Sequence, residues 1–481
     1  MIRLTGLAAL QGIADNVWMT ESSTPANPAA KPLWKTYLAF LLPMIASNIL
    51  QAASGTLNNI YLGQMIGVGA MASVSAFFPV LFFLISFMIG LGAGASVLIG
   101  QAWGAKELDR VKAIAGTTLM VGIGAGLIVA LFGGTFTEHM LLALGTPADI
   151  LPGSTAYARI MLIAAPGIFV FLLVTSMLRG VGDTKTPLKT LLISTLIGLV
   201  LTPALIRGWL GLPQMGVASG AWAATVSYVV AMSWTAWHLL KTPYGKEGKS
   251  HPLAPDRAFL VHLRIDRVIL GKVLKIGLPT ALSMITISLA EVAVLFLVNR
   301  YGSQATAAYG AVNQIVSYVQ FPAISIAITA SILGAQAIGA GRTQNLGKIA
   351  QTGIAMNLIL TGALVLIGYV LSRYMLRLFI TDEAVVDLAQ SLLHIMLWSS
   401  VVMGMSMVLS GLMRASGAVM VPTLLSMLAI GAIEIPAAWL LSNRFGLSGI
   451  WAAYPIAFIA MLSMQTAYYR LVWKKRPIKR L

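Results

Sequence analysis

The chain has 481 residues, of which 58% are hydrophobic and only 10% are charged. Soluble domains carry a charge on about a quarter of their residues, so this composition excludes a soluble protein and indicates an integral membrane protein. The formal net charge of +17 would favour nucleic-acid binding in a soluble protein. In a membrane protein excess Lys and Arg orient the loops instead, so we expect no nucleic-acid partner.

The first 33 residues precede the first long apolar segment. The apolar run over residues 4–14 is interrupted by polar residues and glycines and is too short to span a bilayer. As a signal peptide it is weak, because no clear small-residue cleavage site follows it. Met19 and the polar residues after it resemble a second translation start site. We therefore predict that residues 1–33 are an N-terminal extension that is disordered or lies on the membrane surface.

Twelve segments of about twenty apolar residues follow, each long enough to cross about 30 Å of hydrocarbon as a helix. Strands of a membrane barrel would show alternating segments of about ten residues, and the sequence has none. The segments lie near residues 35–60, 69–99, 112–134, 155–178, 187–206, 215–239, 272–299, 304–337, 348–371, 388–413, 422–442 and 447–471. The sequence therefore predicts an all-α integral membrane protein with twelve transmembrane helices.

A polar, basic run from Lys241 to Lys275 interrupts the apolar segments near the middle of the chain. Such a run cannot lie in hydrocarbon, so we predict a loop on a membrane surface. It divides the chain into an N-lobe with helices 1–6 (residues 34–240), a linker (241–271), a C-lobe with helices 7–12 (272–472) and a basic C-terminal tail (473–481).

The basic residues are distributed unequally between the two sides of the predicted membrane. All but six of the 32 Lys and Arg residues fall on the side of the linker and the termini, and cytoplasmic loops are the basic ones in membrane proteins. We therefore predict a multi-pass protein of the cytoplasmic (inner) membrane with both termini in the cytoplasm. The six residues on the other side are Arg159, Arg207, Arg300, Arg373, Arg377 and Arg444.

The two halves of the chain resemble each other at an offset of 235 residues. The matches that chance explains least well are Gln101 with Gln336, Arg179 with Arg414 and Pro187 with Pro422. Because each half has an even number of spans, both enter the membrane from the same side, which predicts two six-helix lobes related by a pseudo-two-fold axis along the membrane normal. Secondary transporters are built from such repeats, with sites near the midplane. A duplication without transport is the alternative.

Four motifs of the sequence resemble the MATE (multidrug and toxic compound extrusion) family. They are Gln101-Ala-Trp-Gly-Ala-Lys, Leu178-Arg-Gly-Val-Gly-Asp-Thr-Lys-Thr-Pro-Leu, Gly334-Ala-Gln-Ala-Ile-Gly-Ala-Gly and Met413-Arg-Ala-Ser-Gly. The resemblance runs from about Leu33 to the end of the chain. It implies two six-helix lobes arranged in a V and the export of organic cations and drugs against a proton or sodium gradient.

The sequence departs from the family pattern at two places. Many members carry an aspartate in the first helix, in a pattern like Asp-x-x-x-x-Gly, and alignment on Gly63 places Asn58 there, followed by Asn59. An amide does not release a proton, which argues against proton coupling at this position and leaves substrate binding open. The second departure is Glu434, where relatives often have arginine before an apolar-Pro pair.

Only two of the fifteen acidic residues lie deep in apolar segments. Glu291 lies twelve residues after Pro279, or about 18 Å of helix, and Glu434 lies twelve residues after Pro422. A carboxylate at that depth costs about 2.5–3.5 kcal/mol, so it should face a cavity or a partner. We predict that both carboxylates couple transport to H⁺ or Na⁺, with Na⁺ bound at Glu291. The alternative is a carboxyl that only packs the lobe through hydrogen bonds.

Polar residues of the same segments are candidates for substrate contact. Ser288 precedes Glu291 by three residues and therefore shares its helical face. The eighth segment carries a polar stripe, which either binds substrate or merely joins helices. We predict a cavity lined by Asn58, Asn59, Ser288, Asn313, Gln314, Tyr318 and Gln320.

No Gly-rich phosphate loop with Lys-Ser/Thr is present, so the energy for transport should come from an ion gradient. We expect no cofactor and no enzymatic activity, small cationic molecules and membrane lipid as partners, and a monomer. One alternative is a flippase for a lipid-linked saccharide or another amphiphile, which would need cationic residues in the cavity. A membrane enzyme would need clustered His, Asp or Ser side chains, and the five His are scattered.

Overall fold

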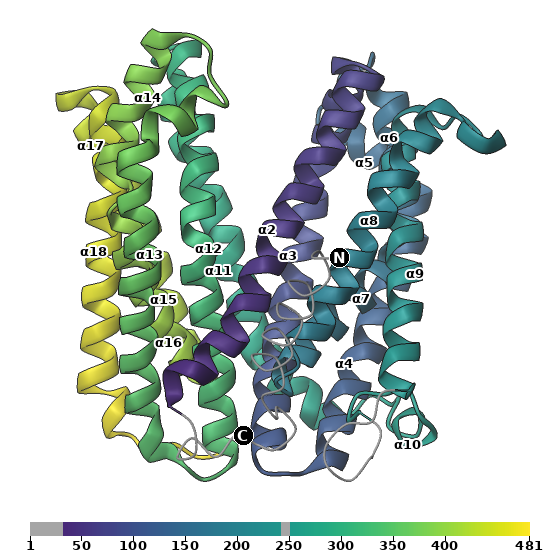
Figure 1. The fold of residues 1–481 in the computed structure, drawn as a ribbon, viewed down its shortest axis with the longest axis vertical. Coiled ribbons are helices and arrows are strands. Elements are labelled where there is room, and N and C mark those ends of the chain that lie inside the picture. The colour runs from purple at the N-terminus through teal and green to yellow at the C-terminus, as the bar shows by residue number, and fades with distance from the viewer. Residues whose placement is uncertain (1–31, 242–250) are drawn as a thin grey trace, which may run out of the picture.

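A computed structural model describes residues 32–241 and 251–481, which are almost entirely helical (Figure 1). The predicted N-terminal extension lies, up to residue 31, outside the described residues, and so does Met19. The predicted all-α fold is confirmed.

Nine helical elements build the N-terminal bundle within the described residues. These are α2 (Leu33–Met65), α3 (Val68–Gly104), α4 (Leu108–Ile128), the π-helix η1 (Val129–Gly133), α5 (Gly134–Ala143), α6 (Leu151–Ile163), α7 (Ala165–Gly180), α8 (Lys185–Arg207) and α9 (Ser219–Lys241). Two short 3₁₀-helices, η2 (Trp209–Gly211) and η3 (Gly216–Ala218), connect α8 to α9.

The second half repeats this plan after the short helix α10 (Arg257–Leu260). Its elements are α11 (Arg267–Asn299), α12 (Ser303–Gly339), the 3₁₀-helix η4 (Thr343–Asn345), α13 (Leu346–Arg377), α14 (Glu383–Met396), α15 (Ser399–Ala415), α16 (Met420–Leu428), the π-helix η5 (Ala429–Glu434), α17 (Ile435–Phe445), α18 (Leu447–Leu471) and the 3₁₀-helix η6 (Trp473–Lys475). Among the described residues, ten helices are long and apolar enough to cross a membrane, and twelve spans result if the bent pairs α6–α7 and α14–α15 are counted as one each.

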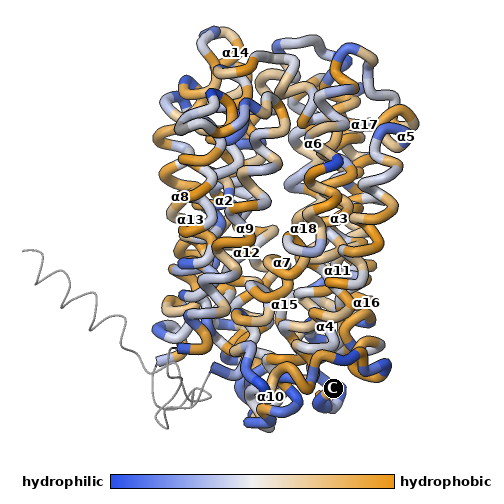
Figure 2. Tube along the Cα trace, turned by 90° about the vertical axis from the view of Figure 1, so that its right-hand side faces the viewer, coloured by the Kyte–Doolittle hydropathy of each residue, from blue (hydrophilic) through white to orange (hydrophobic). Residues whose placement is uncertain are grey.

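The helices form two bundles, the N-lobe (α2–α9) and the C-lobe (α11–α18). Figure 1 shows the lobes diverging toward one end and meeting at the other. We call the end where they meet the linker end, because α10 and the C-terminus lie there, and the opposite end the far end. Figure 2 shows apolar residues along the length of the bundles and polar residues concentrated at both ends, as expected for a protein that spans a bilayer.

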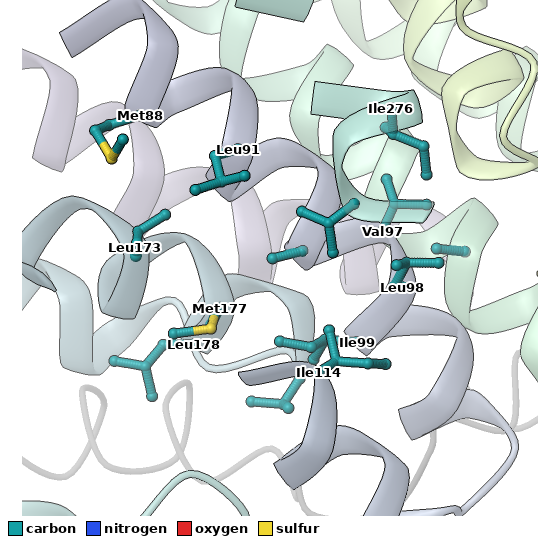
Figure 3. Close-up of a cluster of buried hydrophobic side chains, with 14 of the residues drawn as sticks. Met88, Leu91, Val97, Leu98, Ile99, Ile114, Leu173, Met177, Leu178 and Ile276 are labelled. Carbon is teal, nitrogen blue, oxygen red and sulfur yellow. The ribbon is translucent and has the colours of Figure 1, made fainter. Parts of the chain in front are cut away.

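The first part of α11 packs against α3 of the opposite lobe. A Cβ atom on Gly90 would lie 2.5 Å from the Gly277 carbonyl oxygen, so only glycine lets the two backbones come this close. In Figure 3, Ile276 of α11 lies with Val97 and Leu98 of α3 in the same apolar cluster. The last part of α11 is buried in the C-lobe instead, through residues such as Val294. The helix therefore connects the two lobes.

The first helix of the described residues, α2, makes the corresponding crossing. Near its start, the buried Tyr37 hydroxyl donates to the Ile349 carbonyl of α13 (2.8 Å). Near the middle of the helix, Asn48 Nδ2 donates to Ser325 Oγ of α12 (3.0 Å). The rest of α2 packs against α8 of its own lobe. Each half thus sends its first helix under the other lobe, which holds the linker end together.

The described part of the linker is folded onto the N-lobe. Thr117 Oγ1 of α4 donates to the Arg264 carbonyl (3.0 Å), and the Lys112 ammonium lies 3.9 Å from the Asp256 carboxylate. The helix α11 begins at Arg267, five residues before the predicted segment, because Asp266 caps it by accepting hydrogen bonds from two backbone amides of the first turn. Hydropathy does not detect such a polar first turn.

Candidate functional site

The two deep carboxylates lie together in the C-lobe. Glu291 is on α11, and Glu434 is the last residue of η5, which packs against α11. The carboxyl groups are close enough to interact electrostatically. Glu434 is only 4% exposed, whereas Glu291 is exposed. That each carboxylate faces a cavity or a partner stays a prediction.

Two tyrosines complete the polar surroundings of the carboxylates. Tyr309 of α12 and Tyr454 of α18 bring their side chains close to each other, and the side chain of Asn313, one turn after Tyr309, lies close to Tyr309 as well. The Tyr309 hydroxyl lies 3.4 Å from the backbone carbonyl oxygen of Glu291. We call Glu291, Tyr309, Asn313, Glu434 and Tyr454 the C-lobe polar cluster.

The π-helix η5 explains how Glu434 reaches this cluster. Pro436 follows two residues later and has no amide hydrogen, so the turn before it cannot close with the usual helical bonds. The helix widens, and the Ile435 amide donates to the Ile430 carbonyl five residues back. The missing proline donor leaves a backbone carbonyl of this turn without its helical partner. Carbonyls of interrupted helices are groups that coordinate Na⁺ in transporters.

The arrangement favours the binding of a positive charge. Two carboxylates in a nonpolar region repel each other strongly because the local dielectric constant is low. A proton, a metal cation or an organic cation held between them removes this repulsion. The rings of Tyr309 and Tyr454 supply hydroxyl groups, and Trp451 packs edge-on against Tyr309 with the ring centroids 5.6 Å apart.

The predicted N-lobe residues lie across the molecule from this cluster. Asn58 is half-buried on α2, and its side-chain oxygen would be 3.3 Å from a Cβ on Gly220 of α9. Asn59, its neighbour, is exposed. Nearby, Ser154 and Ser219 are fully buried, and within the described part of the chain their hydroxyls have no hydrogen-bond partner. This side of the molecule is polar but carries no deep carboxylate among the described residues.

The remaining predicted residues lie on α11 and α12. Ser288 is half-buried, three residues before Glu291. Gln314, Tyr318 and Gln320 are also half-buried, and Tyr318 packs edge-on against Phe321 of the same helix (5.6 Å between centroids). Of the predicted α12 residues, the structure therefore places Asn313 in the C-lobe polar cluster, beside Tyr309. A substrate-binding role for the other three α12 residues stays a prediction.

Sequence reasoning did not find the two tyrosines of the cluster. Tyr309 precedes Asn313 by four residues, a spacing that places both on one helical face, so a search for polar partners along α12 would have found it. Tyr454 comes from the last helix, and its proximity follows only from tertiary packing. No group of three or more His, Cys, Asp or Glu side chains suited to a metal ion occurs within residues 32–241 and 251–481.

The two repeats also supply a symmetric pair of contacts at the linker end. Gln101 Nε2 of α3 donates to the Ala415 carbonyl (2.7 Å), at the end of α15. Gln336 Nε2 of α12 donates to the Gly180 carbonyl (3.1 Å), at the end of α7. Each glutamine therefore reaches the opposite lobe. These two glutamines correspond to each other in the internal repeat, but the sequence alone predicted no role for them.

The model of the MatE family matches the chain twice, at residues 43–204 and at residues 279–440. The chain belongs to the MATE family. The two matches start 236 residues apart (279 against 43), which confirms the internal repeat predicted at an offset of 235. The predicted resemblance is also confirmed.

Relatives with known names agree with this assignment. The chain is 42% identical to the "Probable multidrug resistance protein YoeA" of Bacillus subtilis (strain 168) over 455 residues, which cover 94% of this chain and 97% of that protein. It is 24% identical to the "Multidrug export protein MepA" of Staphylococcus aureus (strain NCTC 8325 / PS 47), with 92% of this chain and 94% of the relative covered.

Solved structures share the fold. A crystal structure of a MATE protein in complex with MaD3S matches with a TM-score of 0.82 at 20% identity, covering 91% of this chain and 95% of that one. A structure described as the outward-facing conformation of a multidrug resistance MATE family transporter also gives a TM-score of 0.82, at 19% identity, covering 95% and 97%. The chain is thus a multi-pass membrane transporter of the multidrug efflux MATE family with the predicted two-lobe fold.

Proposed function

We propose that this MATE transporter is a secondary active antiporter that exports organic cations in exchange for H⁺ or Na⁺. The observation that carries the proposal is the C-lobe polar cluster, where the deep carboxylates of the described helices, Glu291 and Glu434, lie together. Substrate and coupling ion carry the same sign of charge, so they compete for one site. Such competition is what exchange transport requires.

The uncharged N-lobe surface would contact the rest of the substrate. Asn58 and Asn59 offer amide groups there, and an amide side chain does not ionise near neutral pH, so it cannot carry a coupling proton. Proton or sodium coupling is therefore assigned to the C-lobe, and substrate contact is shared between the lobes. The flippase alternative is less favoured because the cluster is acidic and would repel a phosphate group.

Alternating access follows if the two occupants favour different lobe arrangements. A ligand shifts a conformational equilibrium only by its difference in affinity for the two states. Occupation of the cluster by the ion or by the substrate would supply that difference, because Glu291 is on α11, which also packs against α3 of the N-lobe. A change in charge on this helix is transmitted to the lobe interface.

We assign the linker end to the cytoplasm from the distribution of basic residues. The linker and the tail after Arg470 are rich in Lys and Arg, and the tail and the described part of the linker lie at this end. The bacterial relatives support a location in the cytoplasmic membrane. With this orientation the structure is an outward-open state, because the lobes meet at the linker end and diverge at the far end. The proposed transporter is a monomer with both termini in the cytoplasm.

The test is ethidium efflux from proteoliposomes with an imposed proton or sodium gradient. We expect one gradient to drive efflux, and Glu291→Gln to reduce the rate at least tenfold while Glu138→Gln, at an exposed far-end carboxylate, leaves it unchanged. Glu434→Gln should also lower the rate. Transport by Glu291→Gln at the wild-type rate and with the same gradient dependence would show that coupling does not run through the C-lobe cluster.

A further inference from the structure

The chain after α18 crosses from the C-lobe to the N-lobe. It turns through η6, and the residues that follow, 476–481, run back under the two lobes at the linker end. Figure 1 places the C-terminal residue between the lobes. The proposed function gives no role to this segment.

The tail is attached to the C-lobe at the turn that follows α15. The buried Trp473 donates through its indole nitrogen to Ser416 Oγ (2.9 Å). The Leu481 side chain lies against Gly417, where an added Cβ would be 2.9 Å from Leu481 Cδ2. Gly417 has a φ of +80°, a left-handed conformation that glycine adopts at little cost. The turn therefore presents a flat backbone surface on which Leu481 packs.

The same tail is attached to the N-lobe by polar contacts. The Arg480 guanidinium pairs with both carboxylate oxygens of Glu107, which lies between α3 and α4, with Nη1 to Oε1 at 2.6 Å. The Leu481 amide donates to Gln101 Oε1 (2.8 Å), and the Arg110 guanidinium donates to the Leu481 carbonyl. The hydrogen bonds from Arg480 lower the pKa of Glu107, so this pair is fully ionised at neutral pH.

Gln101 links these contacts to the lobe interface. Its amide nitrogen donates to Ala415 of the C-lobe, and its carbonyl oxygen accepts from Leu481 of the tail. The tail thus touches Gln101 and the turn directly after Ala415, on the two sides of a contact that must break when the linker end opens. In the first repeat the corresponding segment, the linker, contacts its own lobe through residues such as Arg264 and Asp256.

We propose that residues 480 and 481 form a latch that holds the linker end closed and so favours the outward-open state. The proposal rests on the alternating access described above. Arg480 acts through the conformational equilibrium and does not touch the transported cation. Release of the latch is then one of the steps that permit the inward-open state.

The experiment measures the opening of the linker end directly. The protein has no cysteine, so spin labels can be attached to Asp109→Cys on α4 and Gln344→Cys on η4, both exposed positions on opposite lobes. Pulsed electron–electron double resonance on the full chain in proteoliposomes gives the fraction of molecules in which the two labels lie far apart, with the linker end open. Arg480→Ala should raise the ratio of open to closed molecules about threefold, and Lys479→Ala, an exposed basic neighbour, should not change it.

A charge exchange distinguishes a specific pair from general loss of charge. Glu107→Lys should open the linker end as Arg480→Ala does, and the double variant Glu107→Lys with Arg480→Glu should restore the wild-type ratio. Added salt should reduce the effect of Arg480→Ala, because a partly exposed pair is screened. Unchanged ratios in both single variants, or equal opening by Lys479→Ala, would overturn the latch.

The latch and the proposed function fail in different ways. If imposed gradients open the linker end but Arg480 has no influence on the ratio, the latch is wrong and alternating access stands. If no gradient and no variant produces the long distance, alternating access is wrong and the latch falls with it. The distance measurement itself does not depend on transport, so it can be repeated in Glu291→Gln, where a retained Arg480 effect supports the latch alone.

Discussion

The two lobes approach each other closely at Gly104 and Gly339, at the ends of α3 and α12. A Cβ atom on Gly104 would lie 2.8 Å from the carbonyl carbon of Gln336 and closer still to its oxygen. A Cβ on Gly339 would lie 2.7 Å from the carbonyl carbon of Gln101, in the same relation. Both neighbours are backbone groups, which cannot rotate away as a side chain can. Alanine at either position must therefore separate the two helices.

The magnitude can be worked out from these contacts. Cβ atoms in real structures stay beyond 3.0 Å from other heavy atoms, so the helices must move apart by about 1 Å, and overpacking of this kind costs about 1–3 kcal/mol. The same movement weakens without breaking the hydrogen bonds of Gln101 and Gln336, each worth about 1 kcal/mol, and so adds about 1 kcal/mol in all. A total of about 2–4 kcal/mol changes the ratio of open to closed linker ends by about 30- to 700-fold.

The assay is the distance between spin labels at residues 109 and 344. We expect Gly104→Ala and Gly339→Ala to move most molecules to the long distance, while Gly347→Ala, where an added Cβ meets nothing within 4 Å, leaves the distribution unchanged. Alanine is the better helix former by about 0.5–1 kcal/mol, so helix propensity cannot cause the opening. Folded Gly104→Ala protein with a wild-type distance distribution would refute the reasoning.

Two further predictions concern the linker and the C-lobe. Burial lowers the pKa of His251 to about 4, against the opposing effect of Asp183 at 3.8 Å. An exposed histidine titrates at about pH 6.5, so protonation at lower pH favours the undocked linker. Docking of the linker is therefore complete above about pH 6.5 and weakens as the pH falls toward 4. Between pH 7.5 and 5 the loss is about 2 kcal/mol. The protection factors of residues 256–266, which correct for the slower intrinsic amide exchange at low pH, should fall by about 30-fold, and pH-independent protection factors in wild type would contradict this origin. Asn357→Ala should lower stability by about 1–2 kcal/mol, because it leaves the Val401 carbonyl and the Thr361 hydroxyl of the buried C-lobe unpaired. Thermal unfolding in detergent measures the loss, with Thr286→Ala, an exposed hydroxyl that bonds its own helix, as the control; equal melting temperatures would contradict it.

The number and order of the spans could be predicted because the bilayer imposes one length on every transmembrane helix. The helix ends could not, because polar residues set them. Asp266 starts α11 before the apolar segment begins, and hydropathy does not register a cap. Likewise, sequence length alone does not show that α6–α7 bends by 55°.

The depth of the two carboxylates could be predicted from the rise of a helix, but their orientation could not. Counting from Pro422 assumes a regular helix, and η5 inserts a wider turn just before Glu434. That turn rotates the residues after it relative to those before it. The contacts with Tyr309 and Tyr454 depend on this rotation and on the packing of α12 and α18. Local sequence patterns hold no information about such contacts.

The two lobes differ at positions that the repeat makes equivalent, and such differences can give transport a direction. At the offset of 235 residues, Glu291 corresponds to Thr56 and Glu434 to Leu199, so the acidic cluster has no counterpart in the N-lobe. The glutamines of α3 and α12, by contrast, make equivalent contacts across the interface. A symmetric hinge lets the lobes rock without favouring either one. A cation site in a single lobe then makes the occupancy of that lobe decide the conformation, because α11 alone among the described helices carries both a deep carboxylate and a long contact with the other lobe.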